Sequence, residues 1–262
     1  MPGIDSLTPD TPVVITDPSE RGKDDHLWGD RLMVRIGNFL AWLFPVLMLA
    51  IVSQVIMRKA GFNQAWLDDA QWWIYGVAML AAFGYSITNE SHVRVDILHQ
   101  RFSDQKKARI EVFALGWLLL PFIAVMTDIL IHYAWASFIA KEGSDSPNGL
   151  HRLYLLKISL PVLFLCAGIA AWASLKRNHA KFAHPHFWKL VLAALPLFLF
   201  VTERIAFYAL WWYIRFTQPD IKSRRIPKEP LMEHSLTIGL CLLAAVLVIA
   251  FFKRSRLSER NV

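Results

Sequence analysis

Long, mostly apolar segments constrain this chain more than any other feature of its sequence. Six of them follow one another, at residues 33–57, 70–88, 110–134, 155–174, 190–214 and 236–252. Runs of about 18 or more apolar residues are typical of membrane helices, and in lipid a helix satisfies the hydrogen bonds of its own backbone. The sequence therefore predicts an all-α fold, that of a polytopic helical membrane protein.

The first 26 residues differ in composition from everything that follows. They are acidic and rich in proline, and their acids outnumber Arg21 and Lys23. A cleavable signal peptide needs a basic start and then an apolar core, and neither is present. We expect residues 1–26 to form a disordered acidic cytoplasmic tail, and the first membrane helix to be retained.

The segment 190–214 leaves two arrangements open, because Glu203 and Arg204 lie near its middle. Charged side chains at that depth are costly in lipid unless they are paired or face protein. The segment either crosses the membrane or lies in the interface. Its length favours a crossing. Residues 179–262 then form a C-terminal extension with two further membrane helices, which gives six helices in all.

The distribution of Lys and Arg over the short loops predicts the orientation, because cytoplasmic loops are enriched in these residues. The loop between the second and third segments contains Arg94, Arg101, Lys106, Lys107 and Arg109, whereas the loop before it has only a pair at 58–59. We therefore expect a cytoplasmic N-terminus. The segment 141–152 then lies outside. Beyond residue 214, the distribution of Lys and Arg fits the two arrangements of the segment 190–214 almost equally well.

No motif for catalysis, for a cofactor or for a metal stands out. The chain lacks HExxH, GxSxG and GxxxxGK[ST], so we expect no enzyme activity, no cofactor and no metal site. Cys166 and Cys241 lie in apolar runs without CxxC spacing, which favours small buried residues over ligands. The net charge of +7 suggests contact with anionic lipid head groups rather than nucleic acid.

Two polar residues in the segment 110–134 could carry chemistry. Asp128 is the best candidate for an ion ligand, and His132 is the best-placed histidine for a membrane haem. Both lie toward one end of the segment. The expected role of each is therefore that of a hydrogen-bonded residue near the interface.

A dense polar stretch, residues 86–112, separates the second apolar segment from the third. Polar and apolar residues alternate in "HVRVD" (92–96), which favours a short extended segment or a turn into an interfacial helix. Ser103 precedes Asp104 and is a candidate N-cap for the third helix. The stretch is expected to anchor the membrane end of the second helix.

These residues resemble a known family. "HVRVDIL", followed by "RFSDQKKARIEV" and "LLLPFIAV", is similar to the small permease subunit (DctQ-like) of tripartite ATP-independent periplasmic (TRAP) transporters. The matching positions are His92, Val93, Arg94, Val95, Asp96, Phe102, Ser103, Arg109, Leu120, Pro121 and Phe122. The segment "KEGSDSPNGLHRLYLLKISLPV" resembles the branch often labelled mannitol/chloroaromatic. Such proteins usually stop after four membrane helices, so residues 27–178 are expected to form the DctQ-like domain.

The resemblance implies a function, partners and site residues. It implies a scaffold subunit of a symporter in the bacterial inner membrane that takes up an organic acid or a related small solute. The implied partners are a DctM-like large permease subunit, a periplasmic substrate-binding protein and membrane lipids. The implied partner or lipid interface consists of His92, Arg94, Asp96, Arg101 and Arg109. The implied periplasmic docking loop contains Glu142, Ser144, Pro147 and Gly149.

Two other classes of protein stay open as alternatives. One is the membrane anchor of a respiratory enzyme, which would hold haem or quinone, and the placement of the histidines argues against it. The other is a stand-alone carrier. Such carriers usually contain two related halves, and this chain has no internal repeat.

Overall fold

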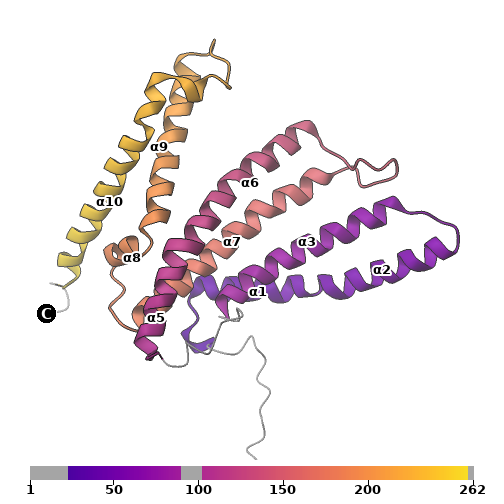
Figure 1. The fold of residues 1–262 in the computed structure, drawn as a ribbon, viewed down its shortest axis with the longest axis horizontal. Coiled ribbons are helices and arrows are strands. Elements are labelled where there is room, and N and C mark those ends of the chain that lie inside the picture. The colour runs from indigo at the N-terminus through magenta and orange to yellow at the C-terminus, as the bar shows by residue number, and fades with distance from the viewer. Residues whose placement is uncertain (1–22, 90–101, 259–262) are drawn as a thin grey trace, which may run out of the picture.

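The computed structural model describes residues 23–89 and 102–258, and this part of the chain consists of helices and turns without a strand. Figure 1 shows three helix hairpins that diverge from a shared base. The main helices are α1 (Trp28–Ala41), α2 (Leu43–Lys59), α3 (Ala65–Thr88), α5 (Asp104–Phe113), α6 (Leu120–Ala140), α7 (Leu153–Ala180), α8 (Phe187–Ala193), α9 (Leu195–Thr217) and α10 (Ser235–Ser258). The short elements are η2 (Lys23–Asp25), the π-helical η3 (Ala114–Leu119), η4 (Ile226–Lys228) and η5 (Pro230–His234).

The predicted class, a polytopic helical membrane protein, is confirmed. In the described residues, five helical segments are long and apolar enough to cross a membrane: Trp28–Lys59, Asp104–Ala140, Leu153–Ala180, Leu195–Thr217 and Pro230–Phe252. They correspond to five of the six predicted segments. The remaining one, residues 70–88, lies in α3, a helix of 24 residues that pairs with α2. That α3 also crosses the membrane stays a prediction.

Two prolines explain where the long helices depart from α geometry. Proline has no N–H, and its ring clashes with the carbonyl four residues earlier. For Pro45 that carbonyl belongs to Ala41, the residue at which α1 ends. For Pro121 it belongs to Trp117 in η3, and there the Leu120 N–H bonds the carbonyl of Leu115, five residues back. The helix continues through this π-helical turn into α6.

Helix α7 lies at the centre of the bundle and packs against α1, α3 and α6. Three of its buried alanines, Ala167, Ala170 and Ala171, are fully inaccessible to solvent. Small residues let the backbones of membrane helices approach closely. The buried cluster around them includes Met33 of α1, Ile87 of α3 and Leu190 of α8. The core therefore lies at the base of the bundle, where the hairpins meet.

The end of α8, just before the C-terminal hairpin of α9 and α10, makes a close backbone contact with this core. Gly116 in η3 faces the carbonyl of Ala193, and a Cβ at Gly116 would overlap that oxygen. Within the hairpin, a Cβ at Gly239 would lie 2.7 Å from the Cα of Glu203. Glycine is thus required at both close approaches.

The start of α3 corrects one expectation. Asp68, with Gln71 three residues further on, has the spacing of a capping box at the start of a helix, but α3 begins at Ala65 with Gln64 in the N-cap position. The side chain of Asp68 instead accepts a hydrogen bond from Gln54 of α2 and lies 3.4 Å from Arg58. The Asp68 carboxylate therefore binds Gln54 and Arg58 of α2 instead of capping α3.

Candidate functional site

Besides the Asp68 contacts between α2 and α3, polar side chains of the described residues gather at three places that we consider in turn. The first is the loop between α6 and α7. The ammonium of Lys157 on α7 donates to both carboxylate oxygens of Glu142, at 2.7 and 2.6 Å. It also lies 4.2 Å from the centroid of the Tyr133 ring on α6. Lys157 is buried, so these contacts compensate for the water that its ammonium loses.

A second contact fixes the same loop to α3. Oδ2 of Asp69 accepts a hydrogen bond from the backbone N–H of Leu150, at 2.9 Å. A Cβ at Gly149 would collide with Ser144 Oγ and with Asp69 Oδ2, so glycine is required there. We call Asp69, Glu142, Gly149 and Lys157 the loop latch, because together they bind the loop to α3 and α7.

The electrostatics of the latch follow from the pairing. Hydrogen bonds from the Lys157 ammonium lower the pKa of Glu142 below its ordinary value of 4.5. Glu142 is therefore ionised at neutral pH and keeps its attraction for Lys157.

The second place is the base of the bundle. Asp30 of α1 is fully buried, and its Oδ2 lies 2.9 Å from Nη1 of Arg177 on α7. The same guanidinium donates through Nη2 to the carbonyl of Thr88, at 3.0 Å. This basal ion pair, Asp30 and Arg177, joins α1, α7 and the end of α3. Nearby, burial lowers the pKa of His26 below 6.5, which favours its neutral form.

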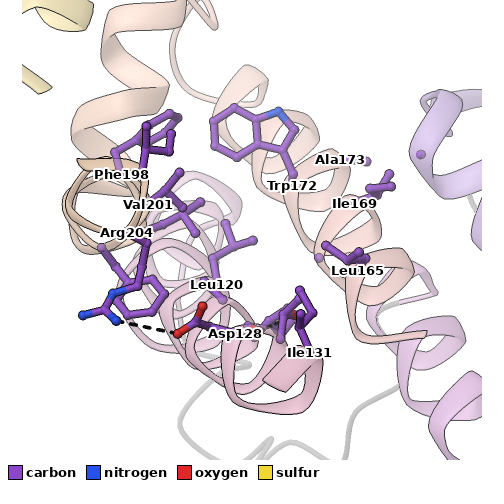
Figure 2. A pocket seen from close by; sticks show the side chains of 18 of the residues that line it. Leu120, Asp128, Ile131, Leu165, Ile169, Trp172, Ala173, Phe198, Val201 and Arg204 are labelled. Atoms are coloured by element: carbon purple, nitrogen blue, oxygen red, sulfur yellow. Dashed lines mark hydrogen bonds and ion pairs between the residues drawn. The ribbon is translucent and has the colours of Figure 1, made fainter. Parts of the chain in front are cut away.

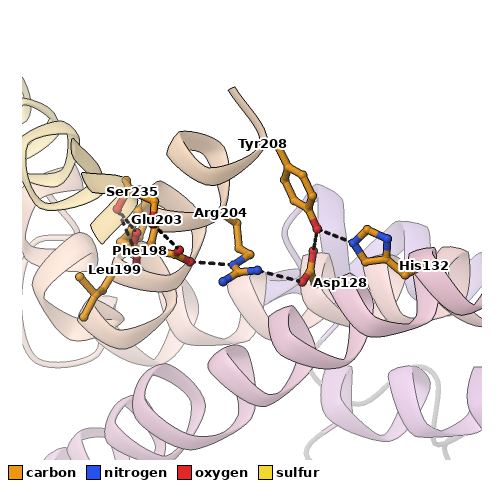
Figure 3. Close-up of polar contacts among 9 residues, drawn as sticks. Asp128, His132, Phe198, Leu199, Glu203, Arg204, Tyr208 and Ser235 are labelled. Carbon is orange, nitrogen blue, oxygen red and sulfur yellow. Dashed lines mark hydrogen bonds and ion pairs between the residues drawn. The ribbon is translucent and has the colours of Figure 1, made fainter. Parts of the chain in front are cut away.

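The third place links α6 to α9, and Figure 3 shows its contacts. Tyr208 donates to Asp128 Oδ1 at 2.5 Å, and its hydroxyl oxygen lies 2.6 Å from His132 Nε2. Arg204 lies 3.9 Å from Asp128 and donates to Glu203 at 2.7 Å. We call these five side chains the α6–α9 cluster. It satisfies polar groups that would otherwise face lipid.

A cavity of about 980 Å³ opens beside this cluster. Figure 2 shows its walls, with α9 on one side and α7 on the other. Most of its lining is apolar, including Leu120, Ile169, Trp172 and Phe198. The charged cluster therefore lies at the edge of a hydrophobic space between the C-terminal hairpin and the rest of the bundle.

Of the five residues predicted to form the partner or lipid interface, the structure describes one. His92, Arg94, Asp96 and Arg101 lie outside the described residues. Arg109 is exposed on α5, with its guanidinium 5.6 Å from the Phe182 ring.

The predicted docking residues lie together in one loop. Glu142 and Gly149 belong to the loop latch, and Ser144 donates its backbone N–H to the carbonyl of Leu150 at 3.0 Å. Pro147 is exposed at the tip. Three of the four residues thus hold the shape of the loop, and Pro147 lies on its surface.

The arrangement offers little for metal chemistry. Among residues 23–89 and 102–258, no group of three His, Cys, Asp or Glu side chains could hold a metal ion. Cys166 and Cys241 are free thiols, and the prediction that they are buried is wrong: Cys166 is partly exposed and Cys241 is exposed. Asp128 and His132 both contact the hydroxyl of Tyr208. This agrees with the expected role of each as a hydrogen-bonded residue.

Comparison with known protein families decides the class. The family described as "Tripartite ATP-independent periplasmic transporters, DctQ component" matches residues 47–181, about half of the chain. The chain belongs to the DctQ family. No curated protein and no solved structure matches it.

The DctQ match places the polar sites relative to the family. It begins within α2 and ends just after α7, so it contains the whole loop latch and Arg177. Tyr208 and Arg204 lie beyond it. As a DctQ protein, the chain is the small subunit of a TRAP transporter and a multi-pass protein of the inner membrane. The α6–α9 cluster joins this DctQ region to the part of the chain that follows it.

Sequence reasoning did not find the contacts between distant polar residues in this DctQ chain. Asp30 and Arg177 were not singled out, and Tyr208 and Asp128 are 80 residues apart. The available signal was the presence of an acid or a base inside an apolar segment, which is costly unless it is paired. That signal marks Asp128 and the neighbouring pair Glu203 and Arg204, but it does not identify Tyr208 as the partner of Asp128.

Proposed function

We propose that this DctQ protein braces a DctM-like large permease subunit in the membrane and helps to dock a periplasmic substrate-binding protein. The exposed apolar surface of α2 carries the proposal. Membership in a family of transporter components supports this class over a respiratory membrane anchor or a stand-alone carrier.

Helix α2 is apolar around nearly its whole circumference. It packs mainly against α3, and Gln54 is its one buried residue. A helix that is hydrophobic on all sides belongs inside a protein or in a membrane. The α2 surface consists of Phe44, Met48, Leu49, Val52, Val55 and Ile56, which are all exposed. This surface suits helices of a larger membrane subunit.

The loop latch supports the docking role. It holds the α6–α7 loop in one shape, while residues 145–148 stay exposed at the tip. A loop that is ordered before binding loses less conformational entropy when a partner docks. The ends of the α2–α3, α6–α7 and α9–α10 hairpins all lie away from the base of the bundle. With a cytoplasmic N-terminus, they would face the periplasm together.

The other interface would lie on the cytoplasmic side. We propose that His92, Arg94, Asp96, Arg101 and Arg109 contact the large subunit or lipid head groups. The contact of Arg177 with the carbonyl of Thr88 supports this role, because it fixes the point from which the polar stretch leaves α3.

The solute is proposed from resemblance alone. Glu142, Ser144, Gly149 and Lys157 match the mannitol/chloroaromatic branch, and we propose symport of an organic acid or a related small solute.

Co-purification tests the bracing role. Tagged full-length chain is extracted from its native membrane in mild detergent, and the bound proteins are identified by mass spectrometry. We expect a multi-helix permease among them. Leu49→Trp with Val52→Trp on α2 should reduce its recovery at least severalfold. Val248→Trp with Ile249→Trp is the matched control, because those residues are equally exposed on α10.

Two results would contradict the proposal. One is recovery of a haem protein or a soluble oxidoreductase in place of a permease. The other is equal recovery of the permease with both pairs of substitutions. Gel filtration of each variant shows whether it is still folded.

A further inference from the structure

The cavity beside α9 adjoins a second one at the base of the bundle. The first, which we call the groove, measures about 980 Å³ and is mostly apolar. The second, which we call the basic pocket, measures about 430 Å³ and is lined by Lys176, Arg177 and Lys181. Both include Leu27 and Lys176 in their linings. The apolar groove is thus adjacent to the basic pocket.

The groove has the dimensions of one membrane leaflet. Along α7 its lining runs from Leu165 to Lys176, a rise of about 16 Å at 1.5 Å per residue. The hydrocarbon core of a bilayer is about 30 Å thick, so this is roughly half of it. Trp28 is exposed at the same end as Lys176. Tryptophan is enriched at the depth of the lipid head groups.

The charges of the basic pocket favour an anion. Asp25 is the one acid in its lining, against three basic side chains. Arg177 is paired with Asp30, whereas Lys181 is exposed and donates to the neutral Asn178 at 2.9 Å. In the described part of the chain, the exposed Lys176 has no ion pair. Two lysines therefore remain to neutralise a phosphate.

We propose that the groove and the basic pocket together bind one anionic phospholipid. Its acyl chains lie in the groove between α9 and α7, and its phosphate lies against Lys176 and Lys181. A membrane-spanning helix of a partner fits less well, because it needs an apolar path through the whole bilayer. The lining of the groove instead includes the charged pair Asp128 and Arg204, which lie 3.9 Å apart.

This lipid site is independent of the bracing and docking roles. It depends on α7 and α9 of this chain, so it would exist whether or not a permease binds α2. It also gives the C-terminal hairpin a role, because α9 forms one wall of the groove.

The experiment measures lipid retention by the full-length chain with the partners that co-purify. The complex is exchanged into detergent with equal amounts of phosphatidylglycerol and phosphatidylcholine, and native mass spectrometry counts the lipids retained. We expect a clear preference for phosphatidylglycerol. A basic residue near an anionic lipid surface contributes about fivefold in affinity, so Lys176→Gln with Lys181→Gln should lower the preference by about 30-fold. Lys106→Gln is the control, since Lys106 is an exposed lysine on α5 outside both cavities.

A second variant tests the groove. Val201 lines it and is exposed, and Val201→Trp should reduce retention of both lipids by filling the space. Equal retention of the two lipids by the wild type would overturn the proposal. So would an unchanged preference in the double lysine variant, or unchanged retention with Val201→Trp. Cross-linking of another protein chain to residue 201 would assign the groove to a partner helix instead.

Discussion

Lys157 of α7 binds Glu142 through both carboxylate oxygens, and its ammonium lies against the ring of Tyr133. The pair joins the start of the α6–α7 loop to the helix that follows the loop. It lies at the end of the hairpin that is proposed to meet the binding protein. The shape of this surface therefore depends on a charge pair between a buried lysine and a half-buried acid.

Removal of the acid should loosen the loop. In Glu142→Gln the ammonium of Lys157 stays buried without a carboxylate, which is costly. We expect faster cleavage of residues 145–148 in limited proteolysis. Adding Lys157→Met should restore part of the resistance, because the unpaired charge is then removed as well. Asp145→Asn changes an exposed acid in the same loop and should leave the cleavage rate unchanged.

The same contact predicts a dependence on pH. The pKa of Glu142 is lowered in the folded protein by hydrogen bonds from Lys157. A group with a lowered folded-state pKa stabilises the fold above its ordinary value, here 4.5, and loses that contribution as the pH falls through the folded value. Loop protection should therefore be constant near neutral pH and decrease below 4.5. A pH series of proteolysis in Glu142→Gln should lack this decrease; if wild type and variant respond alike, Glu142 is not the group responsible.

Glycine at position 149 should be required for the latch. A Cβ there would overlap Ser144 Oγ and Asp69 Oδ2, so Gly149→Ala must displace the loop or the start of α3. We expect a lower melting temperature in detergent and weaker binding of the periplasmic protein. Gly143→Ala is the matched control, because a Cβ at that position meets its nearest atom at an ordinary 3.4 Å. Equal behaviour of the two variants would contradict the assignment.

The basal ion pair should be more important for stability than an exposed pair. Removing one partner of a buried pair costs about 3–5 kcal/mol, because the other charge is left uncompensated. Asp30→Asn removes the buried carboxylate that lies 2.9 Å from Arg177, and thermal unfolding in detergent measures the loss. Arg58→Gln breaks an exposed pair with Asp68 and should cost about 0–1 kcal/mol. Similar losses for the two variants would mean that Asp30 is not buried as described.

Tyr208 should fasten the C-terminal hairpin to α6. Tyr208→Phe removes the hydroxyl that contacts both Asp128 and His132. Hydrogen bonds between membrane helices contribute about 0.6–2 kcal/mol each, so a loss of this size is expected. Disulfide cross-linking between cysteines introduced into α6 and α9 should become slower or less specific. Tyr213→Phe changes an exposed tyrosine on the same helix and should have no effect on cross-linking.

The sequence by itself determined the fold class and the approximate positions of the helices. Long apolar segments leave the backbone no other way to satisfy its hydrogen bonds in lipid. Local signals also placed some boundaries. Ser103 does precede the first residue of α5, although its side chain makes no capping hydrogen bond. The family, too, was visible in a local motif.

The tertiary structure decided which polar groups meet. Asp68 looked like a helix cap, but α2 lies close enough to bind its carboxylate. Asp30 meets Arg177, and Asp128 meets Tyr208, only because the helices bring together residues far apart in the sequence. Such contacts depend on how each helix is rotated and tilted against its neighbours. Apolar residues on nearly every side of a membrane helix leave that rotation undetermined, so the latch, the basal ion pair and the groove appear only once the helices are packed.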